Sequence, residues 1–223
     1  MTRPTAIQAL CFDLDNTLVD RNGVWSRFHR EWLAEQPRVP AAARTALFRQ
    51  LMDLDGFGLG SRDDQDCFLA AHWDFSAADI AAKHRQWVVA IPRLFPRDPA
   101  RCDLLHRLAA RFPLALVNNG GSQTQRAKLA ASGLGSCFAA DGLFLSAECG
   151  AAKPEPAIFR AALAWLGIPA ENTLFIGDDP QRDILGAAAL GMKTCWLANP
   201  HLDPVTADWT IDSIFDLEPL LYA

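Results

Sequence analysis

The fold is decided by residues 6–17, AIQALCFDLDNT. The first seven residues of this stretch are mostly apolar and end abruptly at Asp13, which is typical of a buried strand whose carboxyl end meets a polar loop. Asp13 and Asp15 then stand two residues apart. Two carboxylates this close repel each other unless a cation neutralises them or one is protonated. The stretch therefore predicts a buried strand with a charged site at its end, although a solvated turn or a helix cap built from Asp15 would also fit it.

Residues 19–96 have a helical character, because their apolar positions recur at helical spacing. We expect four helices in this segment and almost no strand. The first includes Trp25, Phe28 and Trp32, and the others cover residues 41–52, 63–73 and 77–91, the last with Ser76 as its cap.

Past residue 99 the chain alternates between helical and strand-like segments. Helices are expected at residues 100–111, 123–131, 155–166 and about 182–190, and short strands at 113–117, 142–146, 173–176 and 193–197. This alternation predicts right-handed crossovers and a parallel sheet covered on both faces. We therefore expect a doubly wound, Rossmann-like α/β core made of residues 1–18 and 97–223, with residues 19–96 as a helical insertion.

Composition and charge restrict the classes of function. Of the 223 residues, 50% are hydrophobic and 21% are charged, which is enough apolar side chain for a folded core. The 21 basic and 26 acidic residues give a net charge of -5 without a basic block, which argues against nucleic acid as a partner. The segment MTRPTAIQAL lacks a signal-peptide core and no apolar run reaches spanning length, so we expect a cytoplasmic protein with no membrane partner.

The cysteines and histidines do not form a metal-binding pattern. The six cysteines are scattered without a Cys-x-x-Cys pair, and we expect buried, reduced thiols. The five histidines lack the close helical spacing of a zinc site. These patterns argue against a zinc hydrolase and a disulfide-stapled domain.

Two further segments place donors near predicted strand ends. Asn118, Asn119 and the two following glycines come after a strand and before a helix, where amides and backbone N–H groups hold anions. Asn and Gly also favour an ordinary strand-to-helix turn. Lys153 is a lone cation before a helix that Pro156 can start, and an isolated lysine is more often an exposed loop residue.

A second acidic group follows the strand predicted at residues 173–176. Asp178 and Asp179 come after Gly177, and Asp183 lies further along the next helix. Asp179 and Asp183 fit helix N-terminal charges equally well when each is taken alone. Together these segments offer acids at two strand ends, amide donors at a third and a cation near a fourth, at the edge where ligands bind in such sheets, a combination that favours a hard divalent ion such as Mg²⁺ and an anion.

With these motifs in order, the sequence resembles the haloacid dehalogenase superfamily, most of whose members are Mg²⁺-dependent phosphotransferases. Its Asp-x-Asp-x-Thr motif is matched by residues 13–17, its lysine motif by residues 153–156, and its last acidic motif by Gly177 to Asp179 with Asp183. The insertion lies where one branch of the superfamily carries a four-helix cap. The second motif departs from the pattern, because Asn118 stands where the family has Ser or Thr.

The resemblance implies a mechanism and a role for each residue. Asp13 is the nucleophile that forms an aspartyl-phosphate, and Asp15 is the acid and base for the leaving oxygen and the attacking water. Lys153, Asn118 and Asn119 bind the phosphoryl group. The expected Mg²⁺ ligands are Asp13, Asp178 and the backbone carbonyl of Asp15, with Asp183 in a supporting position and Asp179 reaching the ion through water.

Asp15 separates two reactions within the resemblance. True dehalogenases lack an Asp at this position because a halide leaves without a proton, so Asp15 favours phosphoryl transfer. The cap is expected to choose the substrate, with Arg21, Trp25 and Arg62 as candidate contacts. Trp25 also fits the apolar stripe of its helix, and Arg62 also fits an exposed turn after the glycine-rich segment 56–60.

The expected function is a Mg²⁺-dependent phosphatase that acts on a small phosphorylated metabolite, as a monomer or homodimer. A phosphomutase of the same superfamily is one alternative. A non-catalytic phospho-acceptor or binding module is another, and Asn118 leaves open a family member that binds partners without turnover. Asp15 and the helical insertion argue against a simple phospho-acceptor.

Overall fold

The chain forms two compact units in the computed structural model, which describes residues 7–222. The helical unit is Asp20–Phe95, and the α/β unit contains the described residues up to Val19 and from Pro96 onward. Ala6, where the first strand was predicted to begin, lies outside the described residues.

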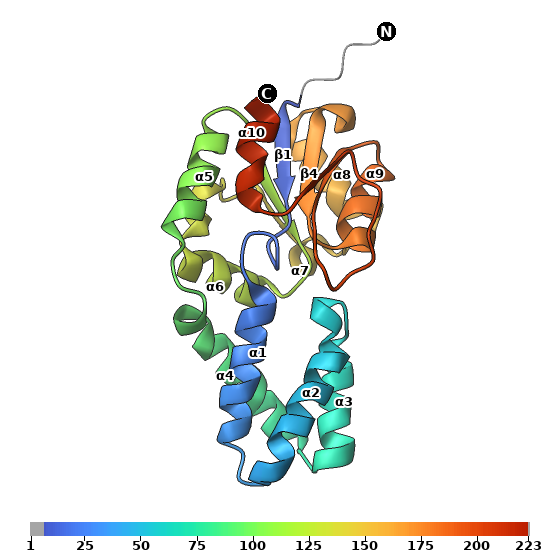
Figure 1. Cartoon of the computed structure of the whole chain (residues 1–223). Helices are drawn as coiled ribbons and strands as arrows, with labels where there is room; N and C mark the ends of the chain where they lie inside the picture. Colours follow the sequence, from blue (N-terminus) through green and yellow to red (C-terminus); the bar gives the residue numbers. More distant parts are fainter. Residues whose placement is uncertain (1–6, 223) are drawn as a thin grey trace. The chain divides into compact units, whose positions relative to one another are not determined.

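The α/β unit is built on a six-stranded parallel sheet of order β3-β2-β1-β4-β5-β6 (Figure 1). Its strands are β1 (Ala9–Phe12), β2 (Leu114–Asn118), β3 (Leu143–Leu145), β4 (Thr173–Gly177), β5 (Lys193–Leu197) and β6 (Trp209–Ile211). Its α-helices are α5 (Pro99–Ala109), α6 (Ser122–Ser132), α7 (Ser146–Cys149), α8 (Pro156–Leu166), α9 (Gly186–Ala188) and α10 (Leu217–Tyr222). Short 3-10 turns lie at Leu134–Cys137, Ala170–Asn172 and Ile214–Asp216. This arrangement confirms the predicted doubly wound α/β fold.

The centre of the sheet places the acidic segments side by side. Cys11 of β1 pairs with Ala115 of β2 on one side and with Phe175 of β4 on the other. The chain builds outward from β1 through β2 to β3, then returns to place β4 on the opposite side of β1. The strand order therefore reverses between β1 and β4, which is the point where open α/β sheets bind ligands beyond the carboxyl ends of their strands.

The central strands are buried on both faces, which explains their continuous apolar sequence. One face of the sheet packs in a cluster that includes Cys11, Val117 and Phe175 with Ile158 and Phe159 of α8. Burial on both faces fixes the strand ends, so the loops that follow them have defined positions.

Several parts of the α/β unit differ from the sequence-based expectation, among them the short helix α7, which begins at the last residue of the strand predicted at 142–146. The helix predicted from about residue 182 begins as a π-helix, Pro180–Leu185, before the short α9. The Asp179 carboxylate accepts hydrogen bonds from the backbone N–H groups of Gln181 and Arg182, both at 2.9 Å, and its carbonyl accepts the five-residue bond from the Ile184 N–H at 3.3 Å. The strand β6 and the helix α10 follow the last predicted element, and their three and six residues are too few for a periodic signal.

The helical unit contains the four predicted helices. They are α1 (Arg21–Ala34), α2 (Arg44–Asp55), α3 (Arg62–Trp73) and α4 (Ala77–Leu94), with 3-10 turns at Ala41–Ala43 and Gly56–Gly58. Ser76 caps α4 in a capping box with Asp79, as its position predicted. Trp25 is buried and packs against Phe28 and Trp87 with ring centroids 5.9 and 4.7 Å apart. Trp25 is therefore part of the core of this unit.

The cysteines correct one expectation. All six thiols are free, but Cys67 and Cys149 are exposed, whereas the other four are buried. In α3 the buried residues Gln65 and Leu69 share one face, and Cys67, two positions from each, points away from it. Within residues 7–222, no helix combines the length and the apolar character needed to cross a bilayer.

Candidate active site

Three buried carboxylates meet at the carboxyl ends of β1 and β4. Asp13 follows β1, Asp178 follows β4, and Asp183 lies on the π-helix after β4. One oxygen from each lies within 4.8 Å of the others. Asp13 is 4% exposed, Asp178 6% and Asp183 1%, so all three carboxylates are shielded from bulk solvent.

Lys153 supplies the positive charge of this group. Its Nζ lies 2.6 Å from Asp13 Oδ1 and 2.6 Å from Asp183 Oδ1, and the residue is 4% exposed. Asn119 fixes the backbone of Lys153, because its Oδ1 accepts from the Lys153 N–H at 2.8 Å and its Nδ2 donates to the Lys153 carbonyl at 2.9 Å. The lysine is therefore held from both its side chain and its main chain.

The pKa values of the group reflect burial first and neighbouring charge second. Burial raises the pKa of Asp13 well above its ordinary value, Lys153 opposes this, and Asp183 and Asp178 add to it. Burial and then Asp183 raise the pKa of Asp178 to about 7. Burial works against the charge of Lys153, but Asp13 and Asp183 outweigh it and raise the Lys153 pKa. Three carboxylates thus share one ammonium group.

This donor set fits a divalent cation. Without another positive charge, the group has more carboxylates than a single lysine neutralises, and burial makes the excess negative charge costly. Hard cations such as Mg²⁺ prefer carboxylate and carbonyl oxygens. Asp13 and Asp178, both predicted as ligands, are brought together here, and Asp183 joins them directly.

Asp15 lies beside this group, and its carboxylate faces α6. The loop turns sharply at Asn16, whose φ is 63°, a conformation that Asn tolerates better than most residues. Asp15 Oδ1 accepts from Lys128 Nζ at 2.5 Å, and Oδ2 accepts from Gln125 Nε2 at 3.2 Å. The Asp15 side chain is 21% exposed, whereas Lys128 and Gln125 are buried.

The segment after β2 contributes side-chain amides to this region. Asn118 is buried, and its Nδ2 donates to Asp15 Oδ2 over a long 3.4 Å. Asn119 bonds to the main chain of Lys153, as described above. Gly120 has a φ of 143° and donates its N–H to Ser146 Oγ at 2.9 Å. These bonds place Asn118 beside Asp15. They also connect the loop after β2 to the loop that contains Lys153.

The acidic pair after β4 divides into two environments. Asp178 accepts from Asn199 Nδ2 at 3.2 Å and from Thr17 Oγ1 at 3.4 Å. Asp179 caps the π-helix through its carboxylate, and its N–H donates to Asp183 Oδ2 at 3.1 Å. Asp178 therefore belongs to the group of buried carboxylates, whereas the Asp179 side chain accepts hydrogen bonds from backbone N–H groups at the start of the π-helix.

Arg62 lies at the start of α3 in the helical unit and is exposed. Its guanidinium carbon is 5.4 Å from the centre of the Trp25 ring, and that of Arg21 is 5.0 Å from the same ring. Arg21 also forms a bidentate ion pair with Asp55. The two arginines and Trp25 thus form one stacked group within this unit.

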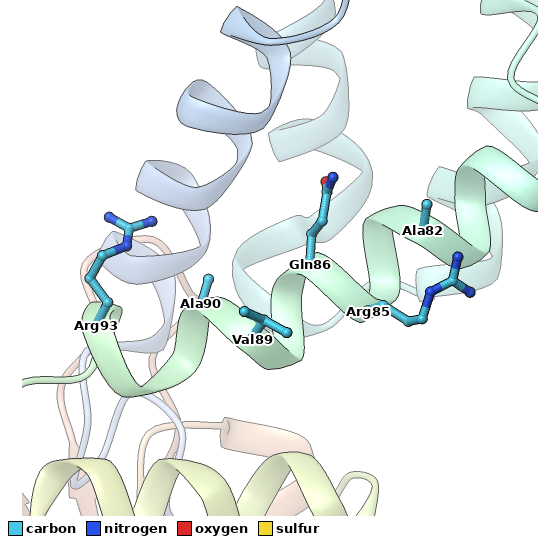
Figure 2. Close-up of a pocket in the computed structure, with 6 residues that line it drawn as sticks. All are labelled: Ala82, Arg85, Gln86, Val89, Ala90 and Arg93. Atoms are coloured by element: carbon cyan, nitrogen blue, oxygen red, sulfur yellow. The ribbon is translucent and has the colours of Figure 1, made fainter.

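A separate hollow of about 600 Å³ lies along the outer face of α4, as Figure 2 shows. It is lined by Ala82, Arg85, Gln86, Val89, Ala90 and Arg93. Its lining has two arginines and no carboxylate, and it includes none of the predicted site residues, so its chemistry differs from that of the group at the sheet edge.

Some residues at the sheet edge were missed by the sequence analysis. Lys128 and Gln125 stand three positions apart on α6, and that spacing places them on one helix face. Trp196 lies within β5 and Asn199 follows that strand, and Trp196 Nε1 donates to the Asp178 carbonyl at 2.9 Å. In the sequence, the only feature that marks Lys128 and Gln125 is their spacing on one face of a helix that carries both polar and apolar residues. That spacing does not indicate which carboxylate they face.

Comparison with protein families finds a match over most of the chain. A family model described as haloacid dehalogenase-like hydrolase matches residues 7–191. Pyrimidine 5'-nucleotidase YjjG of Escherichia coli is 35% identical over 127 residues, which cover 55% of this chain and 56% of that protein. The matched region thus spans about half the length of this relative.

Two other relatives match over nearly their full length. N-acylneuraminate-9-phosphatase of Mus musculus is 31% identical, with 96% of this chain and 94% of that protein covered. Among solved structures, the HAD-hydrolase YfnB from Bacillus subtilis, bound to magnesium, has a TM-score of 0.76 and 26% identity, with 98% of this chain and 100% of that chain covered.

Proposed function

Because this chain belongs to the haloacid dehalogenase-like hydrolase family, we propose that it is a Mg²⁺-dependent phosphatase acting on a small phosphorylated metabolite through an aspartyl-phosphate on Asp13. The observation that carries this proposal is the buried contact of Lys153 with Asp13 and Asp183, beside Asp178. It is supported by the phosphatase among the relatives and by the related hydrolase bound to magnesium.

Asp13, Asp178 and the backbone carbonyl of Asp15 are the proposed ligands of the ion. Asp183 lies within the same group of carboxylates, and the N–H of Asp179 holds its second oxygen. When bound, Mg²⁺ supplies positive charge that reduces the repulsion between a carboxylate nucleophile and an anionic phosphate.

The proposed reaction divides into two displacements at phosphorus. An oxygen of Asp13 forms a bond to phosphorus as the bond to the ester oxygen breaks, and Asp15 donates a proton to that leaving oxygen. Asp15 then removes a proton from a water molecule, whose oxygen bonds to phosphorus as the aspartyl-phosphate breaks. Inorganic phosphate leaves, and Asp13 is restored as a carboxylate.

Lys153 and Asn118 hold the phosphoryl oxygens in this proposal. Lys153 already contacts Asp13 at 2.6 Å, so a phosphoryl group bound to its ammonium would lie next to the nucleophile. Asn119 contributes by fixing the Lys153 backbone.

The helical unit is proposed to act as the cap that selects the substrate. Residues 19–96 form this cap in the proposal, and residues 1–18 with 97–223 form the catalytic core. Arg62 is its proposed contact with an anionic end of the substrate, since its guanidinium group lies at an exposed helix start. The six free thiols fit a reducing compartment, so the proposed setting is the cytoplasm.

Phosphate release from a panel of sugar, nucleotide and short-acid phosphates tests the proposal. Each ester is assayed with Mg²⁺ and with EDTA, using the wild type, Asp13→Asn and the control Asp103→Asn, which changes an exposed carboxylate on α5. We expect Mg²⁺-dependent release that Asp13→Asn lowers at least about 10³-fold and Asp103→Asn leaves unchanged.

The panel also separates the alternatives. Full activity in Asp13→Asn would remove the nucleophile assignment. A folded wild type that forms an acid-stable phosphoryl adduct but releases no phosphate would favour a phospho-acceptor. Conversion of an ester to its isomer without net phosphate release, dependent on a bisphosphate primer, would favour a phosphomutase.

A further inference from the structure

The helix α6 directs a buried cation at the carboxylate of Asp15. Lys128 is 3% exposed, and its Nζ lies 2.5 Å from Asp15 Oδ1. Gln125, one turn earlier on the same helix face, is 4% exposed and donates from Nε2 to Asp15 Oδ2 at 3.2 Å. Each carboxylate oxygen therefore has its own donor on α6.

The pair is asymmetric in its burial. The Lys128 side chain is 4% exposed, whereas that of Asp15 is 21% exposed. Burying an ammonium group requires a partner, because desolvation of a lone charge is costly. The lysine thus lies behind the carboxylate, and Asp15 keeps the more open side of the pair.

The loop after β2 leaves the space that Gln125 occupies. A Cβ atom at Gly120 would lie 2.2 Å from Gln125 Nε2, so a side chain at this position would displace the amide. Gln125 Nε2 also donates to the Asn119 carbonyl at 3.3 Å. The same amide therefore connects Asp15 to the segment that fixes Lys153.

We infer that Lys128 and Gln125 are positioning residues that hold the carboxylate of Asp15 in the orientation needed for proton transfer. The inference rests on the proposed phosphatase function, in which Asp15 delivers a proton to the leaving oxygen. It assigns a separate lysine to each aspartate of the first motif, Lys153 to Asp13 and Lys128 to Asp15.

The test uses two esters that differ in their need for a proton. A p-nitrophenyl phosphate loses a stable phenolate, whereas glycerol phosphate loses an alkoxide that must be protonated. Single-turnover rates of leaving-group release, with kcat and KM, are measured for the wild type, Lys128→Met, Gln125→Leu and Lys193→Met. The last is a matched control, because Lys193 pairs with Asp208 in the same unit through a partly exposed contact.

We expect Lys128→Met to slow release from glycerol phosphate at least about tenfold more than release from p-nitrophenyl phosphate, with KM changed by less than about threefold. Gln125→Leu shows the same selectivity with a smaller loss, and Lys193→Met changes neither rate. In an Asp15→Asn background, Lys128→Met adds less than about threefold, since its effect passes through Asp15.

Equal losses on the two esters, or a full additional loss in the Asp15→Asn background, would overturn the inference while the phosphatase proposal stands. If Lys128→Met does not fold, Gln125→Leu decides by the same criterion. A folded wild type that cleaves neither ester nor any member of the metabolite panel would overturn the proposed function itself, and this inference with it.

Discussion

The two units of this molecule bury lysine side chains in opposite ways. In the α/β unit, Lys153 lies 2.6 Å from both Asp13 and Asp183. In the helical unit, Lys83 is 1% exposed, but its nearest ion-pair contact, with Asp66, is 3.6 Å long and exceeds a hydrogen bond. Lys153 is held by short contacts, whereas the Lys83 ammonium lies 5.5 Å from the centre of the Trp32 ring.

The difference appears in the pKa values. Burial lowers the pKa of Lys83 to about 8, since Asp66 only partly compensates for it. The pKa of Lys153 is raised despite complete burial, because Asp13 and Asp183 outweigh desolvation. Burial alone therefore does not distinguish the two lysines, whereas short contacts with carboxylates at a strand end do.

Removing each lysine in turn tests most directly whether the two differ in their effect on activity. Lys153→Met is expected to lower kcat/KM for phosphate release at least about 10³-fold, because it removes the charge beside Asp13 and from the phosphoryl site. Lys83→Met, which removes a buried lysine of the helical unit, is expected to keep kcat/KM within about threefold. Equal losses in the two variants would show that burial, rather than pairing with Asp13, decides the effect.

Acid should destabilise the helical unit through His29. This buried histidine has its pKa lowered from 6.5 to about 3, first by burial and then by Lys83. Its neutral form contributes stability that is complete above pH 6.5 and is lost as the pH falls toward 3. The free energy of unfolding is expected to fall by about 2 kcal/mol from this group between about pH 7.5 and pH 5.

Hydrogen exchange of the α1 and α4 amides, corrected for the intrinsic effect of pH on exchange, measures this loss. His29→Leu should remove the slope, whereas His72→Leu, which changes an exposed histidine of the same unit, should retain it. A slope that persists in His29→Leu would assign the acid sensitivity to other groups.

Lys83 gives an effect of similar size at the alkaline end. Its folded pKa is about 8 and its ordinary value is 10.5, so the charged form destabilises the fold fully below about pH 8 and this cost disappears by about pH 10.5. Lys83→Met should therefore raise the free energy of unfolding at pH 7 by about 1 to 3 kcal/mol. Urea unfolding checks this, with Lys193→Met as the control that should gain nothing.

The sequence predicts the order of most helices and strands and the main charged residues of the candidate site, but not the side chains that these residues contact. Asp13, Asp178 and Lys153 were found because each stands just past or before an element with a strong periodic signal. Lys128 was missed because the carboxylate that it contacts depends on which face of α6 packs toward the sheet edge. The sequence of one helix does not determine that face. The π-helix at Pro180–Leu185 was missed because its six residues are too few for a periodic pattern to separate a π-turn from an α-turn.

The smallest expected effect concerns a neutral donor of the α/β unit rather than a charged one. Asn118→Thr should change kcat/KM by less than about threefold, because the long 3.4 Å bond of Asn118 to Asp15 is weak and a threonine hydroxyl can donate in its place. Asn118→Val, which has the shape of threonine without the hydroxyl, should lose about tenfold. A large loss in the Thr variant would mean that the site is built around the amide, and equal activity of the Thr and Val variants would mean that no donor is needed there. The first result would make the neutral amide a necessary part of this site, whereas the second would confine its chemistry to the charged pairs.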